Sequence, residues 1–198
     1  MTVGIFSIIL IITGSFGIMT IPFAYSQTSS FDVQNIPAKK VNVGDVNIAY
    51  KVFGKGDPFL LISGSGLVMD AWDPTMLREL SSNHTVIIFD NRGVGNTTAG
   101  DKSFSIVQFA NDTAGLLDAL KIQKADILGY STVSFIAQEL ALLHPDKVNR
   151  LVLYGASCGG KENITQSPEV VKILSDIVNN RSQDQEKAFS VSYPRIMD

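Results

Sequence analysis

Two kinds of apolar patterning follow one another between residues 40 and 160. Four short apolar runs have the length of strands that are buried on both faces, and they lie at residues 59–62, 85–89, 125–130 and 148–154. Three longer segments carry apolar residues at helical spacing, at residues 74–81, 105–120 and 133–144. Strands that alternate with helices predict an α/β fold: a doubly wound, mostly parallel sheet with right-handed crossovers.

An antiparallel hairpin is predicted at the start of this sheet. Apolar residues occupy every second position on both sides of a Gly44-Asp45 turn, at Val41 and Val43 before it and at Val46, Ile48 and Tyr50 after it. Period-two patterning around a glycine-containing turn is typical of paired antiparallel strands.

Capping residues mark where two of the predicted helices begin. Asp73 stands before Pro74, which suits the first position of a helix because its ring fixes φ near the helical value. Ser105 and Gln108 have the spacing of a capping box. These signals predict helices that begin at Pro74 and directly after Ser105.

Changes of pattern divide the chain into four segments. They are a leader at residues 1–26, a linker at residues 27–39, the α/β core at residues 40–160 and a helical segment at residues 161–198. In the last segment Ser167-Pro168 begins one predicted helix, a capping box at Ser182 begins another, and no further strand is predicted.

The leader is a long apolar segment. Residues 1–24 contain no Lys, Arg, Asp or Glu, and Ala24-Tyr25-Ser26 fits the small-x-small pattern of signal-peptide cleavage. This pattern predicts a secretory signal peptide. The alternative is an uncleaved transmembrane anchor through residues 3–24, since that run can span about 30 Å of hydrocarbon. Both interpretations predict an extracytoplasmic protein, either secreted or membrane-anchored.

Composition excludes several classes of partner and cofactor. The net charge is -3, and no cluster of Lys or Arg could replace the counterions of phosphates, which argues against a nucleic-acid partner. A single cysteine, Cys158, excludes an intrachain disulfide. His84 and His144 have no Cys or His at ligand spacing, so no metal site is predicted.

Ser131 stands between a predicted strand and a predicted helix. A tight turn at such a junction strains the backbone of its apex residue, raises that side chain above the sheet edge and leaves the next N–H free to face an oxyanion. A serine nucleophile needs this geometry. The alternative is that Ser131 only caps the helix that follows it.

Three motifs in chain order resemble the α/β-hydrolase family. The residues Gly129-Tyr130-Ser131-Thr132-Val133 resemble its nucleophile elbow G-x-S-x-G, with a β-branched valine, expected to crowd the turn, in place of the second glycine. Ser63-Gly64-Ser65-Gly66 stands where the family has its H-G-x-G oxyanion loop, and the residues from Asp90 to Gly95 match D-x-R-G-x-G. The resemblance covers residues 40–160, and it makes residues 161–198 the start of a helical cap.

The resemblance implies a role for each matching residue. Ser131 would be the catalytic nucleophile, and the backbone N–H groups of Ser65 and Thr132 would form the oxyanion hole. Removing one such donor typically costs about 100- to 1000-fold in rate. Asp90 and Arg92 are expected to brace their turn by an ion pair. The residues implied to be structural are Asp90, Arg92, Gly93, Gly95 and Gly129.

The family also uses an acid and a histidine base that follow the serine in the chain. His84 precedes a strand and so lies at the far end of the sheet from Ser131. A helix rise of 1.5 Å per residue places His144 more than about 15 Å from Ser131. Glu162 and Asp198 are conceivable acids. The resemblance therefore implies a chain truncated within the cap, before the strands that supply the histidine.

Three functional hypotheses follow. The first is an exported α/β-hydrolase that cleaves ester or amide bonds of a small-molecule substrate through Ser131, with its acid and histidine missing from this chain. The alternative is an inert fragment or pseudoenzyme that binds a small apolar ligand near Ser131. In the third, a separate C-terminal polypeptide supplies the missing strands and the histidine.

Two glycine-containing loops carry partial cofactor motifs. The segment from Gly155 to Lys161 fits a phosphate loop, but Glu162 replaces the required Ser or Thr and would repel phosphate. Gly64 and Gly66 fit the start of a dinucleotide loop, but Met69 occupies the place of the third glycine. No cofactor is therefore predicted.

Overall fold

The computed structural model describes residues 32–64, 66–156, 167 and 169. The predicted leader, almost all of the predicted cap, and Ser65 lie outside these residues. Within the part that is described, no helix has the length and apolarity needed to cross a membrane. The same residues contain no group of His, Cys, Asp and Glu side chains that could hold a metal ion.

Six strands form one mixed sheet in the order β1-β2-β4-β3-β5-β6. Their bounds are β1 (Lys39–Val43), β2 (Val46–Gly54), β3 (Asp57–Ile62), β4 (His84–Phe89), β5 (Ala125–Tyr130) and β6 (Val148–Tyr154). The pairs β1·β2 and β2·β4 are antiparallel, whereas β3 pairs parallel with β4 and β5, and β5 pairs parallel with β6. The predicted hairpin and the mostly parallel sheet are confirmed.

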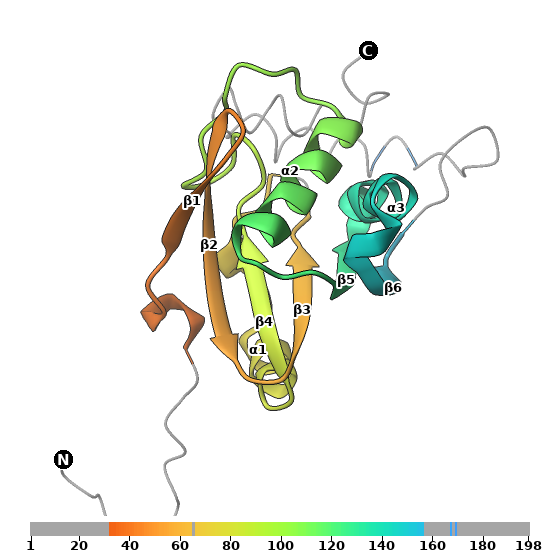
Figure 1. Cartoon of the computed structure of the whole chain (residues 1–198). Coiled ribbons are helices and arrows are strands. Elements are labelled where there is room, and N and C mark those ends of the chain that lie inside the picture. The colour runs from red at the N-terminus through yellow and green to blue at the C-terminus, as the bar shows by residue number, and fades with distance from the viewer. Residues whose placement is uncertain (1–31, 65, 157–166, 168, 170–198) are drawn as a thin grey trace, which may run out of the picture. The chain divides into compact units, whose positions relative to one another are not determined.

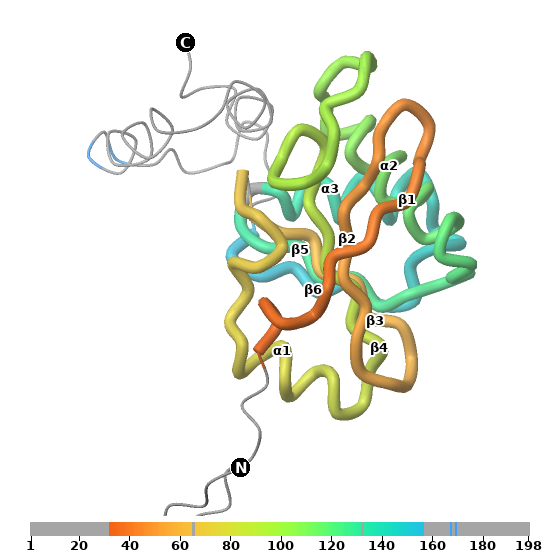
Figure 2. The backbone as a smooth tube through the Cα atoms, turned by 90° about the vertical axis from the view of Figure 1, so that its left-hand side faces the viewer, coloured from red at the N-terminus to blue at the C-terminus, as the bar shows by residue number. Residues whose placement is uncertain are grey.

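Helices cover both faces of this sheet. The three α-helices are α1 (Pro74–Ser81), α2 (Ile106–Ala119) and α3 (Ser134–Leu143). Helices α2 and α3 lie together in front of the sheet in Figure 1, and α1 lies behind it. The view at 90° in Figure 2 agrees with this placement, so the predicted doubly wound arrangement is confirmed.

The predicted capping residues begin their helices as expected. The Asp73 carboxylate accepts a hydrogen bond from the Met76 N–H at 2.8 Å, and the Ser105 hydroxyl accepts one from the Gln108 N–H at 3.0 Å. The side chain of Gln108 does not return to Ser105, because it donates to Asp112 at 2.8 Å. Only half of the capping box therefore forms.

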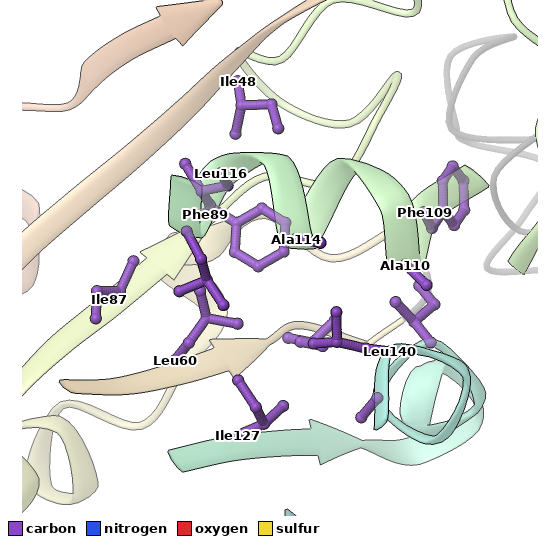
Figure 3. Close-up of a cluster of buried hydrophobic side chains, with 14 of the residues drawn as sticks. Ile48, Leu60, Ile87, Phe89, Phe109, Ala110, Ala114, Leu116, Ile127 and Leu140 are labelled. Carbon is purple, nitrogen blue, oxygen red and sulfur yellow. The ribbon is translucent and has the colours of Figure 1, made fainter. Parts of the chain in front are cut away.

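The main core lies between the sheet and helices α2 and α3. Alternate residues of each strand point to opposite faces, so Leu60 lies in this core while the neighbouring Leu61, also fully buried, faces the α1 side. Figure 3 shows Ile127 of β5 and Leu116 of α2 among the side chains that fill the core. Full burial of such a side chain stabilises the fold by about 1.5–3 kcal/mol.

The described end of the predicted linker packs onto this fold. Residues Val33–Asn35 form a short 3-10 helix, η1, which the Asp32 carboxylate caps by accepting from the Gln34 N–H at 2.9 Å. The side chain of Val33 is only 2% exposed. This segment is therefore anchored before β1 begins.

Candidate functional site

Ser131 occupies the bend between β5 and the helix that follows. Strand β5 ends at Tyr130, and a 3-10 turn, η3 (Ser131–Val133), leads into α3. The φ of Ser131 is 61°, in the left-handed region that residues other than glycine rarely adopt. The alternative that Ser131 caps α3 is wrong, because Val133 occupies the cap position. The predicted strained elbow is therefore present.

The strand and the helix of this elbow approach each other most closely at Gly129. A Cβ atom on Gly129 would lie 2.7 Å from the Cβ of Ala137 and 3.0 Å from the Cα of Ser134. Val133 points instead into the main core, where it is 2% exposed. The expected crowding by Val133 is not found, because the residues at the close approach are Gly129, Ser134 and Ala137.

Backbone groups surround Ser131 on two sides. The Thr132 N–H lies in the first turn of η3, where backbone N–H groups have no partner within the helix. On the other side lies Gly155, where a Cβ would be 3.9 Å from the backbone N and Cα of Ser131. The second predicted donor, the N–H of Ser65, lies outside the described residues.

A small, mainly apolar recess adjoins the elbow. It is lined by residues of the loop after β3 and by the residue before Ser131: Ser63, Gly64, Leu67, Val68, Ala71, Trp72 and Tyr130. Because the wall is mainly aliphatic and aromatic, the recess suits an apolar group rather than a charged one.

The Tyr130 ring joins the walls of this recess. Its centroid lies 5.8 Å from that of Trp72 and 5.5 Å from that of Tyr154, and the second pair is stacked at an interplanar angle of 21°. A Cβ on Gly64 would lie 3.3 Å from the Tyr130 ring. The aromatic contacts therefore hold the loop after β3 against the residue that precedes Ser131.

The ion-pair partners of Arg92 differ from the expected one. Its side chain is fully buried and forms bidentate ion pairs with Asp45 and with Asp112, with all four hydrogen bonds at 2.8 Å. These pairs hold the pKa of Asp45 far below its usual value and raise the pKa of Arg92. The predicted ion pair between Asp90 and Arg92 is wrong.

Asp90 braces the turn through backbone groups. Its carboxylate accepts hydrogen bonds from the Met69 N–H at 2.7 Å and from the Asn96 N–H at 2.8 Å. Burial raises the pKa of this carboxyl group above its usual value. Gly93 and Gly95 have φ values of 71° and 52°, and a Cβ on Gly95 would lie close against the Asp90 carboxylate. Glycine is therefore required at the turn for space and for conformation.

The comparison with known families decides the assignment. The model of the alpha/beta hydrolase fold matches residues 57–190, which is most of the chain. The chain belongs to the alpha/beta hydrolase fold family. The match includes the elbow at Ser131, the turn at Asp90 and the loop after β3.

Relatives of this chain carry names that denote several activities. BpoC of Mycobacterium tuberculosis, designated a non-heme bromoperoxidase, is 38% identical over 109 residues, 54% of this chain and 41% of that protein. The 2-hydroxymuconate semialdehyde hydrolase of a Pseudomonas species is 36% identical over 121 residues, 60% of this chain and 42% of that enzyme. This chain therefore spans about two-fifths of the length of these relatives.

A solved structure supports the same fold. The meta-cleavage product hydrolase CumD from Pseudomonas fluorescens, in a variant complexed with acetates, superposes with a TM-score of 0.61 at 28% identity. The alignment covers 80% of this chain and 64% of the CumD chain. The mixed sheet described above is thus the alpha/beta hydrolase sheet.

Both histidines of this alpha/beta hydrolase chain lie away from the elbow. His84 begins β4, at the opposite end of the parallel strands from Ser131, and its ring packs 5.3 Å from that of Phe59. His144 follows the last residue of α3, and its Nε2 makes a 2.8 Å hydrogen bond with the side-chain oxygen of Asn111. Both histidines thus lie on the elements where the sequence predicted them.

The sequence did not single out several buried or half-buried polar residues of this alpha/beta hydrolase fold. Asp45 and Asp112 hold Arg92, and Lys51 is buried on β2 with its ammonium bonded to Asp70. Partners of this kind are far apart in the sequence, so no spacing pattern reveals them. The burial of Lys51 does have one signal in the sequence. Residues at alternate positions of a strand share a face, so Lys51 lies on the same face of β2 as the apolar residues Ala49 and Phe53.

Proposed function

We propose that this chain carries the nucleophile of an acyl hydrolase that acts on ester or amide bonds of small molecules. The observation that carries the proposal is the left-handed backbone of Ser131 at the end of β5, beside an apolar recess. Such a backbone conformation costs about 1–3 kcal/mol, and it persists only where the surrounding packing enforces it. Strained residues of this kind are common at functional sites. Relatives that are named hydrolases support the same chemistry.

The geometry suggests how the reaction would proceed. A base takes the proton of the Ser131 hydroxyl as the hydroxyl oxygen attacks the substrate carbonyl carbon, and the developing oxyanion accepts a hydrogen bond from the Thr132 N–H. By the family pattern, the Ser65 N–H is the second donor. The apolar part of the acyl group occupies the recess beside Tyr130. The pyramidal intermediate then collapses to an acyl-serine as the protonated base returns its proton to the departing alcohol or amine. Water, which loses a proton to the same base, then hydrolyses the acyl-serine and restores the Ser131 hydroxyl.

Serine needs a base, and the positions of His84 at the start of β4 and of His144 after α3 argue against either histidine in that role. We infer that the imidazole comes from outside these 198 residues, from a longer polypeptide or a separate one. Apolar side chains on β6 support a further element there, because Leu151 is 37%, Leu153 40% and Tyr154 65% exposed. An extracytoplasmic location stays a prediction, which fails if cell fractionation finds the protein in the cytoplasm alone.

The alternative is a chain without hydrolytic activity that binds a small apolar ligand. The apolar lining of the recess and the placement of His84 and His144 favour this possibility. The two proposals differ in whether the Ser131 hydroxyl reacts once a base is provided.

Imidazole in solution can provide that base. Hydrolysis of p-nitrophenyl butyrate should be measured for the purified chain, Ser131→Ala and the control Ser103→Ala, which alters an exposed serine. We expect no protein-dependent rate without imidazole, because a positioned base typically contributes about 100- to 10,000-fold. With imidazole, wild type and Ser103→Ala should exceed Ser131→Ala.

Equal rates for wild type and Ser131→Ala in the presence of imidazole would favour the ligand-binding alternative. A Ser131-dependent rate without imidazole would instead show that the chain holds its own base, contrary to the inference about its histidines.

A further inference from the structure

A lysine is buried on β2, the strand next to the edge strand β1. Lys51 of β2 pairs with Ile88 of β4, and it is only 3% exposed. Its ammonium group donates to the Asp70 carboxylate at 2.7 Å and to the Val33 carbonyl at 2.9 Å. We name these three residues, Lys51, Asp70 and Val33, the Lys51 clamp.

Stability alone does not account for the Lys51 clamp. A charged ammonium loses its hydration on burial, and a buried ion pair is often no more stable than well-packed apolar side chains of similar volume. The ammonium instead fixes the positions of two other segments, because each of its hydrogen bonds is directional and holds one acceptor in place. One acceptor lies in η1 and the other in a short 3-10 turn, η2 (Met69–Ala71).

Turn η2 is held from two sides. Asp70 is bonded to Lys51 of β2, and the N–H of the adjacent Met69 donates to the buried Asp90 carboxylate at 2.7 Å. Two neighbouring residues of one turn are thus tied to two different strands of the sheet, because Asp90 directly follows β4. The turn cannot move without breaking a charge-assisted hydrogen bond.

The loop on both sides of η2 forms the recess. Leu67 and Val68 precede the turn and line the recess, and Trp72 follows it and packs against the ring of Tyr130. Any displacement of η2 would therefore move both the apolar wall and the aromatic contact next to Ser131.

We propose that Lys51 is a positioning residue for the loop after β3. It fixes η2 through Asp70, and thereby holds Trp72 and the apolar wall of the recess against Tyr130. It also makes η1, which precedes the sheet, part of the support of the site. The importance of this wall for substrate rests on the proposed function, whereas the clamp itself does not.

The test measures loop opening rather than turnover. Hydrogen exchange followed by mass spectrometry should compare wild type, Lys51→Met, Asp70→Asn and the control Lys40→Met, which alters an exposed lysine of β1. Loss of a charge-assisted hydrogen bond should speed exchange of peptides covering residues 66–72 by about 10- to 100-fold. Peptides from α2 and β5 should keep their wild-type rates. Lys40→Met should match wild type everywhere.

Trp72 gives a second readout, because it is the single tryptophan of the chain. Its emission should shift to longer wavelength in Lys51→Met and Asp70→Asn as the loop leaves Tyr130, and it should not shift in Lys40→Met. If Lys51→Met does not fold, Asp70→Asn still tests the clamp, because the Asp70 side chain is 35% exposed.

Unchanged loop exchange and unchanged Trp72 emission in Asp70→Asn and Lys51→Met would overturn the proposal. An equal rise in exchange across the whole sheet would also overturn it, because that result indicates a purely global loss of stability. Neither outcome tests the reactivity of Ser131. The role of Lys51 can therefore be refuted without refuting the proposed hydrolase function, and the reverse also holds.

Discussion

Arg92 shows how much of the fold can depend on one side chain. Its guanidinium is buried and paired with Asp45 in the hairpin turn and with Asp112 in α2. It therefore joins the start of the sheet to a helix that packs on it. Its place in D-x-R-G-x-G indicated a structural role. Its partners could not be predicted, because they lie 47 and 20 residues away in the sequence.

Removing the Arg92 charge should destabilise the chain severely. Arg92→Met leaves two carboxylates facing each other, and breaking a buried pair typically costs about 3–5 kcal/mol in the free energy of unfolding. Urea unfolding followed by circular dichroism measures this loss. The control is Arg78→Met, since Arg78 is exposed and pairs only with the adjacent Glu79; its expected change is within about 0.5 kcal/mol. Comparable losses in both variants would contradict the structural role.

The Asp45 carboxylate should make stability depend on pH in acid. Its hydrogen bonds with Arg92 lower its pKa in the folded state, while the unfolded chain keeps the ordinary value of 3.8. The folded state therefore binds fewer protons, so the stabilisation is full above that value and is lost as the pH falls below it.

Unfolding free energies between pH 5 and pH 2.5 measure this effect, with wild type compared to Asp45→Asn and to the exposed control Asp57→Asn. The slope should be shallower in Asp45→Asn and close to wild type in Asp57→Asn. Identical slopes for wild type and Asp45→Asn would contradict the pairing.

At the scale of elements, regular structure was predictable and short turns were not. The bounds of α1 and β5 agree with prediction because capping residues and continuous apolar runs mark them locally. The turns η1 and η2 have too few residues to show a period. Their positions depend on Lys51 and Asp90, which are distant in the sequence.

The elbow shows most clearly the difference between features that the local sequence marks and features that packing decides. Its serine was predictable from the junction of a strand and a helix. Its departure from the family pattern was misjudged, because Val133 turns into the core while Gly129 meets Ser134 and Ala137. Spacing in the sequence indicates which residues are near the turn, but packing decides which of them makes the close contact.

At the scale of the molecule, the candidate site gathers at one end of the parallel strands. The loop after β3, the turn after β4 and the elbow after β5 all follow the carboxyl ends of their strands. His84 lies at the opposite end, and β6 presents exposed apolar residues at the sheet edge. The described residues therefore place Ser131, the proposed nucleophile, beside one wall of a recess on a well-packed sheet.

The left-handed backbone of Ser131 is what makes this bend an elbow, and a comparison of unfolding free energies tests that conformation most directly. Ser131→Gly and Ser131→Ala both remove the hydroxyl, but only glycine adopts this conformation without strain. We predict that Ser131→Gly is more stable than Ser131→Ala by about 1–2 kcal/mol. If Ser131 lay within an ordinary helix, Ser131→Gly would instead be less stable by about 1 kcal/mol, and that result would contradict the elbow.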